Sequence, residues 1–276
     1  MTYTNSNRPR TAGALLFAST AVLIAALSGC SHASPDRTPA AGTQAAETTQ
    51  TPAAGTSTVM WTGDSVAENE APALDAALTA AGARFIDQSS PGGGTVVDSG
   101  GNMSELTTSS WNTLSDAVEK TKPTTIVYQI TTYDWGTPDQ QKAGYQKLAD
   151  EAESVGADLV IVSSPPIVID GFYAPHAAEM ATAPDSAREV AQESDGKVTF
   201  LDASALWGTD GAATKAQRGA DGIHACQQAS AAFAAWFMTE FAKVSGLEPA
   251  APKTWATGDW TSAETYATYD CPTSGK

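Results

Sequence analysis

Residues 58–67 read Thr-Val-Met-Trp-Thr-Gly-Asp-Ser-Val-Ala, and this stretch decides the fold. A short apolar run ends at Gly63-Asp64-Ser65, after which the sequence becomes typical of a helix. The change predicts a strand, a tight glycine turn and a helix in succession. A serine in such a turn lies at the carboxyl edge of a sheet, beside helix N-terminal amides that stabilise negative charge. Ser65 therefore lies where a nucleophile is expected.

Strand-like and helix-like segments alternate after this turn. The predicted strands are residues 83–87, 124–130, 158–163 and 198–201, and the predicted helices are residues 66–81, 103–120, 138–155, 184–194 and 226–244. The second and third of these strands are almost wholly apolar, as strands covered on both faces are. The alternation predicts a three-layer α/β/α sandwich around a mainly parallel sheet. We expect residues 167–183 to form a long loop that lines a pocket.

The composition indicates one domain of catalytic size with an acidic surface. The chain has 276 residues, of which 42% are hydrophobic, and a formal net charge of -16 at pH 7. An acidic surface does not attract nucleic acid or anionic lipid head groups, so neither is an expected partner. We also expect a monomer that uses no cofactor and no metal ion.

The N-terminus has the pattern of an export signal. Arg8 and Arg10 precede an apolar run at residues 12–27, so we predict a signal peptide over residues 1–29. The run ends in Leu-Ser-Gly-Cys30, which resembles a bacterial lipobox. The resemblance implies that Cys30 carries lipid and anchors the chain to the cell membrane on its extracytoplasmic face. The alternative is an ordinary signal peptide followed by a free cysteine.

The rest of the chain divides into three predicted parts. Residues 30–56 contain almost no large apolar side chain, so this segment cannot offset its ordering entropy by burial and is expected to be a flexible tether. Residues 57–245 form the predicted catalytic domain. Residues 246–276 are rich in proline and threonine and are expected to wrap on the domain as a C-terminal arm.

Two cysteines remain once Cys30 is assigned to lipid. Cys226 and Cys271 would both lie in an exported, oxidising setting, which favours a disulfide between them. The bridge would fix the C-terminal arm to the start of the last predicted helix. Two separate buried thiols are the alternative.

Two histidines belong to the predicted domain. His176 stands in the expected long loop, and we predict a structural role for it in preference to a catalytic or metal-binding one. His224 follows Asp221 by three residues, so the carboxylate can bond the imidazole and fix its tautomer. An imidazole held in this way can act as the general base that a serine hydroxyl needs near neutral pH.

These motifs resemble those of a known family. Gly63-Asp64-Ser65 and Asp221-Gly222-Ile223-His224 are similar to the first and last conserved blocks of the SGNH (GDSL-like) hydrolases, and the resemblance covers residues 57–245. It implies an SGNH or flavodoxin-like α/β fold. It also implies that Ser65 is the nucleophile, His224 the base and Asp221 the acid that orients the base.

The resemblance extends less well to the oxyanion hole. The family's second block implies that the amide of Gly92 joins that of Ser65 in this hole. The third block, Gly-x-Asn-Asp, is matched only in its final Asp by residues 131–134, so the Asn donor is missing. The hole is then either weaker or completed by one of three nearby side chains, those of Tyr133, Thr132 and Gln129. This departure resembles SGNH domains associated with membrane acyltransferases.

Together the motifs predict a membrane-tethered, extracytoplasmic serine esterase that forms an acyl-enzyme on Ser65. Its expected substrate is an acylated small molecule, glycan or lipid, with acylated components of the cell envelope as the expected source. Two alternatives stay open. One is an acyl transferase acting on envelope glycans, and the other is a non-catalytic binding protein that keeps the fold.

Overall fold

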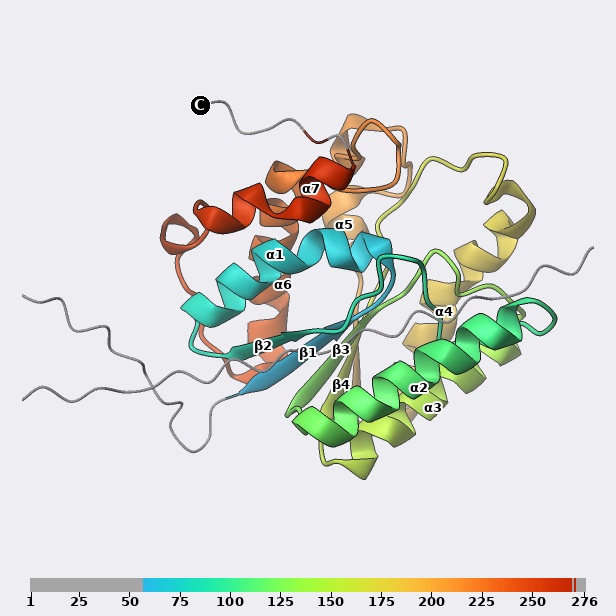
Figure 1. The fold of residues 1–276 in the computed structure, drawn as a ribbon. Helices are drawn as coiled ribbons and strands as arrows, with labels where there is room; N and C mark the ends of the chain where they lie inside the picture. The colour runs from blue at the N-terminus through green and yellow to red at the C-terminus, as the bar shows by residue number, and fades with distance from the viewer. Residues whose placement is uncertain (1–56, 270, 272–276) are drawn as a thin grey trace, which may run out of the picture. The chain divides into compact units, whose positions relative to one another are not determined.

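The computed structural model describes residues 57–269 and 271, and a parallel sheet lies at its centre (Figure 1). The sheet has the order β2-β1-β3-β4-β5, and every neighbouring pair runs parallel. Its strands are β1 (Thr58–Thr62), β2 (Arg84–Asp87), β3 (Thr125–Gln129), β4 (Asp158–Val162) and β5 (Val198–Leu201). The prediction of a mainly parallel sheet is therefore confirmed.

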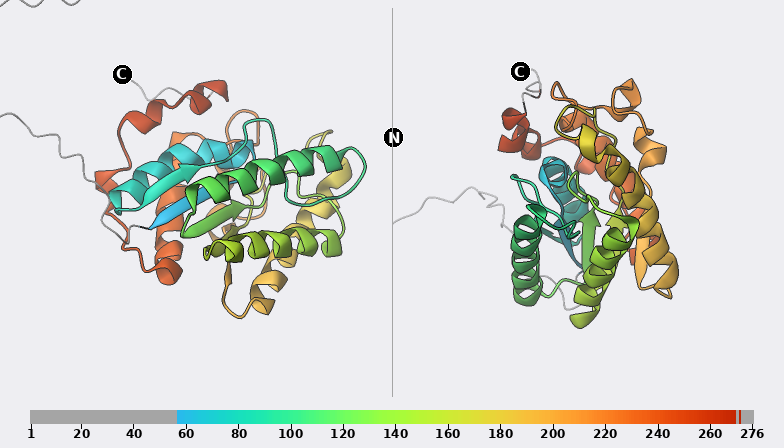
Figure 2. Two further views of the ribbon diagram at one scale, coloured as in Figure 1. Left: turned by 60° about the horizontal axis from the view of Figure 1, so that its bottom comes forward. Right: turned by 90° about the vertical axis from the view of Figure 1, so that its right-hand side faces the viewer.

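Helices cover both faces of this sheet (Figures 1 and 2). The helices are α1 (Ser65–Ala80), α2 (Met103–Thr121), α3 (Pro138–Ser154), α4 (Ala177–Glu193), α5 (Ser204–Trp207), α6 (Gln227–Ser245) and α7 (Glu264–Thr268). One core layer packs α1 and α6 on the sheet, and the other packs α2, α3 and α4. The predicted three-layer sandwich is confirmed.

The strands supply side chains to both core layers because neighbouring residues on a strand point to opposite faces. On β1, Val59 and Trp61 face the layer with α1 and α6, whereas Met60 faces the layer with α2 and α3. On β3, Val127 faces the layer with α1 and α6, and Ile126 faces the layer with α2 and α3. This two-sided burial explains why these strands are apolar at nearly every position.

Helix α4 begins earlier than the sequence indicated. Residues 177–183 were expected to belong to a loop, but α4 starts at Ala177 and contains Pro184 in its interior. A proline inside a helix removes one backbone hydrogen bond. Burial of Ala183, Ala187 and Val190 against the sheet offsets that loss, and this tertiary packing is not visible in the local sequence.

The chain beyond α6 packs back onto the domain. Trp255 and Tyr266 are buried, and α7 lies beside α1 (Figure 1). A disulfide joins Cys226, the residue before α6, to Cys271. The end of the described chain is thereby held at the start of α6.

The predicted signal peptide (1–29), the lipidated Cys30 and the tether (30–56) lie outside the described residues, so they stay predictions. The boundary between the predicted domain (57–245) and arm (246–276) also stays a prediction. Within residues 57–269, no helix combines the length and the apolar character needed to cross a bilayer.

Candidate active site

The turn between β1 and α1 is tightly constrained. A Cβ at Gly63 would lie 2.6 Å from the Cβ of Ala67, so the turn accepts no larger residue without a shift. Asp64 caps α1 by accepting a hydrogen bond from the amide of Val66 at 3.0 Å. Ser65 is the first residue of α1 and thus lies at the carboxyl edge of the sheet, as the sequence predicted.

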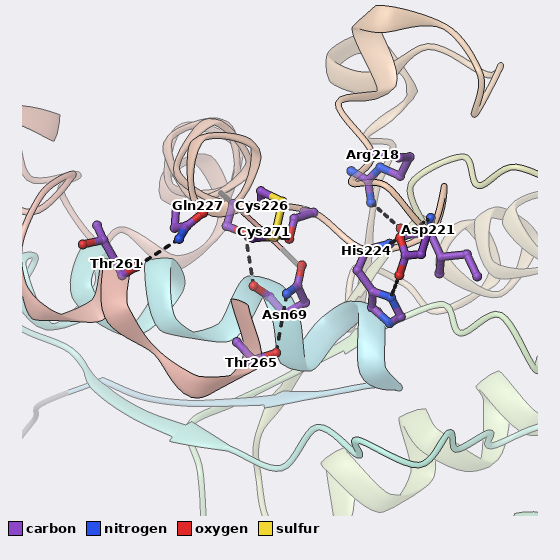
Figure 3. The surroundings of a disulfide bond; sticks show 12 residues. Asn69, Arg218, Asp221, His224, Cys226, Gln227, Thr261, Thr265 and Cys271 are labelled. Carbon is purple, nitrogen blue, oxygen red and sulfur yellow. Dashed lines mark hydrogen bonds and ion pairs between the residues drawn. A yellow bond between two sulfur atoms is a disulfide. The ribbon is translucent and has the colours of Figure 1, made fainter. Parts of the chain in front are cut away.

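The structure brings Ser65, His224 and Asp221 together from opposite ends of the described chain. His224 Nε2 lies 2.9 Å from Ser65 Oγ, and His224 Nδ1 lies 2.5 Å from Asp221 Oδ2. Asp221 and His224 come from the loop before α6 (Figure 3). The hydrogen bonds run in series from carboxylate to imidazole to hydroxyl, which is the geometry of an activated serine nucleophile.

The loop itself fixes Asp221. Its Oδ1 accepts hydrogen bonds from the amides of Ile223 at 2.9 Å and His224 at 3.0 Å. Partial burial acts to raise the pKa of Asp221, but the hydrogen bonds from His224 and Ile223 outweigh it and hold that pKa below its ordinary value. Asp221 is therefore a carboxylate near neutral pH, able to stabilise a protonated imidazole.

The loop after β2 lies beside the Ser65 turn. The amide of Ser90 donates to the carbonyl of Gly63 at 3.0 Å, which fixes the glycine run Gly92–Gly94 next to the turn. Gly92 is exposed, and a Cβ there would meet no atom within 4 Å. Gly93 has φ +91°, and a Cβ there would lie 2.9 Å from the ring of Tyr133. The amides of Ser65 and Gly92 donate to no acceptor among the described residues.

A cavity of about 500 Å³ opens beside this loop. It is lined by Gly63, Gly92, Thr131 and residues of α2. Gly63 of the Ser65 turn thus lines the cavity, whereas Ser65 and His224 do not, and the cavity is large enough for a short acyl chain.

Two of the three side chains considered as the third oxyanion donor are already engaged. The hydroxyl of Thr132 donates to Asp64 Oδ2 at 2.7 Å, and Gln129 Nε2 donates to Glu70 at 2.6 Å. Tyr133 lies against the glycine loop. Burial, together with the neighbouring Tyr173 phenol, raises the pKa of Tyr133 to about 12, so its hydroxyl keeps its proton. Tyr133 is the remaining candidate of the three.

Asp134 has a structural position that the sequence did not reveal. Its carboxylate is fully buried and accepts hydrogen bonds from four hydroxyls, those of Thr95, Tyr128, Thr131 and Tyr145, at 2.7 to 2.9 Å. Thr95 belongs to the glycine loop, so Asp134 joins that loop to the one after β3. Two of the partners, Thr95 and Tyr145, lie on other segments of the chain, and no local sequence signal linked them to Asp134.

His176 makes no hydrogen bond to Ser65, Asp221 or His224 among the described residues. Its ring stacks on Trp135 with 3.6 Å between centroids, and its Nδ1 lies 2.7 Å from Glu179. These contacts fit the structural role predicted for it. Trp135 belongs to an aromatic cluster with Tyr133, Tyr173 and Phe172, and Phe172 is 56% exposed.

The disulfide lies next to the loop that carries Asp221 and His224. Cys226 follows His224 by two residues, and Cys271 lies across from it with a Cα–Cα distance of 5.4 Å (Figure 3). Asn69 on α1 donates to Thr265 on α7 at 3.5 Å, and Gln227 donates to the carbonyl of Thr261 at 3.1 Å. The C-terminal arm is thus bonded to both helices that flank the site.

A comparison with sequence models of protein families identifies the class to which this fold and site belong. The family described as "SGNH domain (fused to AT3 domains)" matches residues 29–220. The chain therefore belongs to the SGNH family, as its motifs indicated. The matched range includes Ser65 and ends one residue before Asp221. No curated protein matches the chain.

Solved structures share the fold at low sequence identity. A protein from Bacteroides fragilis described as an acylhydrolase has 15% identity and a TM-score of 0.52, with 70% of this chain and 90% of that chain covered. The inhibitor-bound aryl esterase of M. smegmatis has 15% identity and a TM-score of 0.51, with 68% of this chain and 99% of that chain covered. These likenesses show the fold alone.

Proposed function

We propose that this chain is an extracytoplasmic serine esterase that cleaves O-acyl esters through an acyl-enzyme on Ser65. The observation that carries the proposal is the series of hydrogen bonds from Asp221 through His224 to Ser65 Oγ. The Ser65 end of this series lies at the N-terminus of a sixteen-residue helix, where developing negative charge is stabilised.

The reaction would have two halves. In the first, Ser65 Oγ attacks the ester carbonyl while His224 Nε2 takes the hydroxyl proton, and the C–O bond to the alcohol then breaks as His224 returns that proton to the departing oxygen. In the second, His224 takes a proton from water, the hydroxide attacks the acyl carbon, and Ser65 leaves with the proton restored. The products are an alcohol and a carboxylic acid.

The oxyanion of each tetrahedral intermediate would lie between the amides of Ser65 and Gly92. Both amides lack an acceptor within the described chain, so they are free to bind a substrate oxygen. One donor in such a hole is worth about 3 kcal/mol of transition-state stabilisation, so a hole without the family's Asn needs the third donor that Tyr133 could supply. The neighbouring cavity offers room for an acyl chain.

The sequence signals and the family support a proposed location and substrate. The predicted lipid on Cys30 would hold the domain at the extracytoplasmic face of the membrane, and the matching family includes domains fused to AT3 domains. An acylated glycan or lipid of the cell envelope is therefore the proposed substrate. The same family description favours acyl transfer as the second candidate, in which a sugar hydroxyl replaces water in the second half-reaction.

The direct test is hydrolysis of p-nitrophenyl acetate by the wild-type chain and by Ser65→Ala. The wild type should hydrolyse the ester, and Ser65→Ala should lose more than about a thousandfold in kcat with its circular dichroism unchanged. Ser154→Ala is the matched control, because this exposed hydroxyl donates to the carbonyl of Glu151 at the end of α3 and does not line the cavity, so the variant should keep full activity. A sugar acceptor that diverts the acyl group from water would favour transferase function. A chain that neither hydrolyses nor transfers any activated ester would be a binding protein.

A further inference from the structure

Tyr269, near the end of the described chain, lies flat on the imidazole of His224. The two ring centroids are 3.5 Å apart, and the ring planes differ by 12°. His224 comes from the loop before α6, whereas Tyr269 comes from the C-terminal arm. The arm therefore covers one face of the proposed base.

Two restraints hold Tyr269 in this place. His224 and Tyr269 each lie two residues from one half of the Cys226–Cys271 disulfide. The amide of Tyr269 also donates to the carbonyl of Thr265 at 3.3 Å, at the end of α7. The bridge and the helix end together restrict how far the two rings can separate.

We propose that Tyr269 is a positioning residue that holds the His224 ring plane so that Nε2 stays aligned with Ser65 Oγ, an inference that rests on the proposed function. Asp221 bonds Nδ1 and Ser65 bonds Nε2, but both hydrogen bonds lie in the ring plane and leave the ring able to rock about the line that joins them. A flat aromatic face in contact with the ring removes that motion. It also excludes water from one side and attracts the imidazolium that forms during reaction.

The phenol of Tyr269 is influenced by charged and polar groups of the same site. Burial and the Glu68 carboxylate raise the pKa of Tyr269, whereas the Ser65 side chain facing the phenol acts to lower it. The contact that the geometry shows is the one between the ring face and the imidazole of His224. We assign the positioning effect to the ring face, because alignment of the imidazole needs contact with its plane.

The variants Tyr269→Phe and Tyr269→Ala separate the ring from the hydroxyl. Tyr269→Phe keeps the stack and should retain kcat within about threefold. Tyr269→Ala removes the stack and should lower kcat about 10- to 100-fold while KM changes by less than about threefold, since misplacement by about an ångström can cost a hundredfold. Trp260→Ala is the matched control: Trp260 also packs in the arm, against Tyr266, without contacting His224, and this variant should keep kcat.

NMR of the full chain supplies a readout that does not need activity. The Hε1 resonance of His224, assigned by its loss in His224→Gln, should lie upfield in the wild type and in Tyr269→Phe because of the stacked ring. It should move downfield in Tyr269→Ala. The Cys226–Cys271 disulfide, checked by mass spectrometry, should persist in every Tyr269 variant.

The inference is overturned if Tyr269→Ala keeps the wild-type kcat or reacts faster, because the ring would then be neutral or would block the site. It is overturned equally if Tyr269→Phe is as slow as Tyr269→Ala, which would assign the effect to the hydroxyl. A wild-type chain that hydrolyses no ester would instead contradict the proposed function. In that case an unchanged His224 resonance in Tyr269→Ala would show separately that the stack does not hold the imidazole.

Discussion

The carboxylate of Asp64 accepts two hydrogen bonds from Thr132, one from its amide and one from its hydroxyl, both at 2.7 Å. Asp64 precedes Ser65, and Thr132 lies in the loop after β3, so this pair joins the turn after β1 to the neighbouring strand's loop. Asp64 is fully buried, and burial raises its pKa while the bonds from Thr132 oppose that rise. The pair fixes the place of Ser65 relative to the rest of the site.

Thr132→Val should test this connection. Valine keeps the shape and the amide bond but removes the hydroxyl, so the free energy of unfolding should fall by about 1 to 3 kcal/mol and kcat should fall with it. Thr107→Val is the matched control, since the buried Thr107 hydroxyl donates only to backbone carbonyls away from the site. Urea denaturation and ester hydrolysis measure both quantities. Equal kcat losses in the two variants would contradict the specific role of the Asp64–Thr132 pair.

The glycine loop gives a second prediction. Gly92→Ala should keep activity within about threefold, because the variant retains the backbone amide and its Cβ would meet no atom within 4 Å. Gly93→Ala should lose stability by about 1 to 3 kcal/mol and also lose activity, because φ is +91° and the new Cβ would press on Tyr133. Thermal unfolding and kcat/KM compare the two neighbours. A Gly93→Ala variant with wild-type stability and kcat/KM would show that the loop does not need its present backbone conformation.

The order of strands and helices along the chain was predictable because the sequence patterns that indicate them are local. Alternating helix-like and strand-like segments, with strands apolar on both faces, follow directly from a covered parallel sheet. The predicted start of α4, at residue 184, was wrong because packing of Ala183 and Ala187 overrides the break expected at Pro184. Propensity is a weak guide where tertiary burial opposes it.

The site was predictable in part for a related reason. Ser65 and the Asp221–His224 pair carry recognisable local motifs, and the fold places both at one sheet edge, although their roles stay predictions. Asp134 itself matches the final Asp of the third family block, but its network of hydroxyl donors and the Tyr269 stack carry no such motif. Their partners are ordinary Thr and Tyr residues, and only the folded arrangement brings them together.

The disulfide gives a third prediction, which concerns turnover. Cys271→Ser should fold but react on the order of tenfold more slowly, because it frees the arm beside the loop that carries His224. The free energy of unfolding should also fall, by about 3 to 4 kcal/mol in the chain-entropy model for this separation. Kinetics of the purified variant give kcat, which should fall more than fluorophosphonate labelling does. Cys226→Ser removes the same bridge and should match it, and full turnover in both variants would contradict the proposal.

Glu70 gives a fourth prediction, on the pH dependence of stability. It is a fully buried residue of α1, and burial raises its pKa to about 8, although the nearby Arg218 and the hydrogen bond from Gln129 oppose the rise. Because the folded state holds this proton more tightly than the unfolded chain, the stabilisation is present at acidic pH and is lost as pH rises through about 8. The wild-type Tm should therefore fall from about pH 5 to about pH 9 through this group.

Glu70→Gln should remove that part of the decline, because the amide does not titrate and can still accept the bond from Gln129. Its Tm should fall by several degrees less than that of the wild type over the same range. The exposed Glu105→Gln is the control and should decline like the wild type. Parallel curves for Glu70→Gln and the wild type would show that Glu70 does not hold its proton in the folded state.

The central claim is that Ser65 is the nucleophile of an acyl-transfer reaction, and covalent labelling tests it most directly. The wild-type chain is treated with a fluorophosphonate and mapped by peptide mass spectrometry. The account predicts a single adduct on Ser65, which should be lost in Ser65→Ala and strongly slowed in His224→Gln, because His224 takes the proton from Ser65 Oγ. An adduct that persists in Ser65→Ala, or a wild-type chain that reacts at another serine, would contradict it.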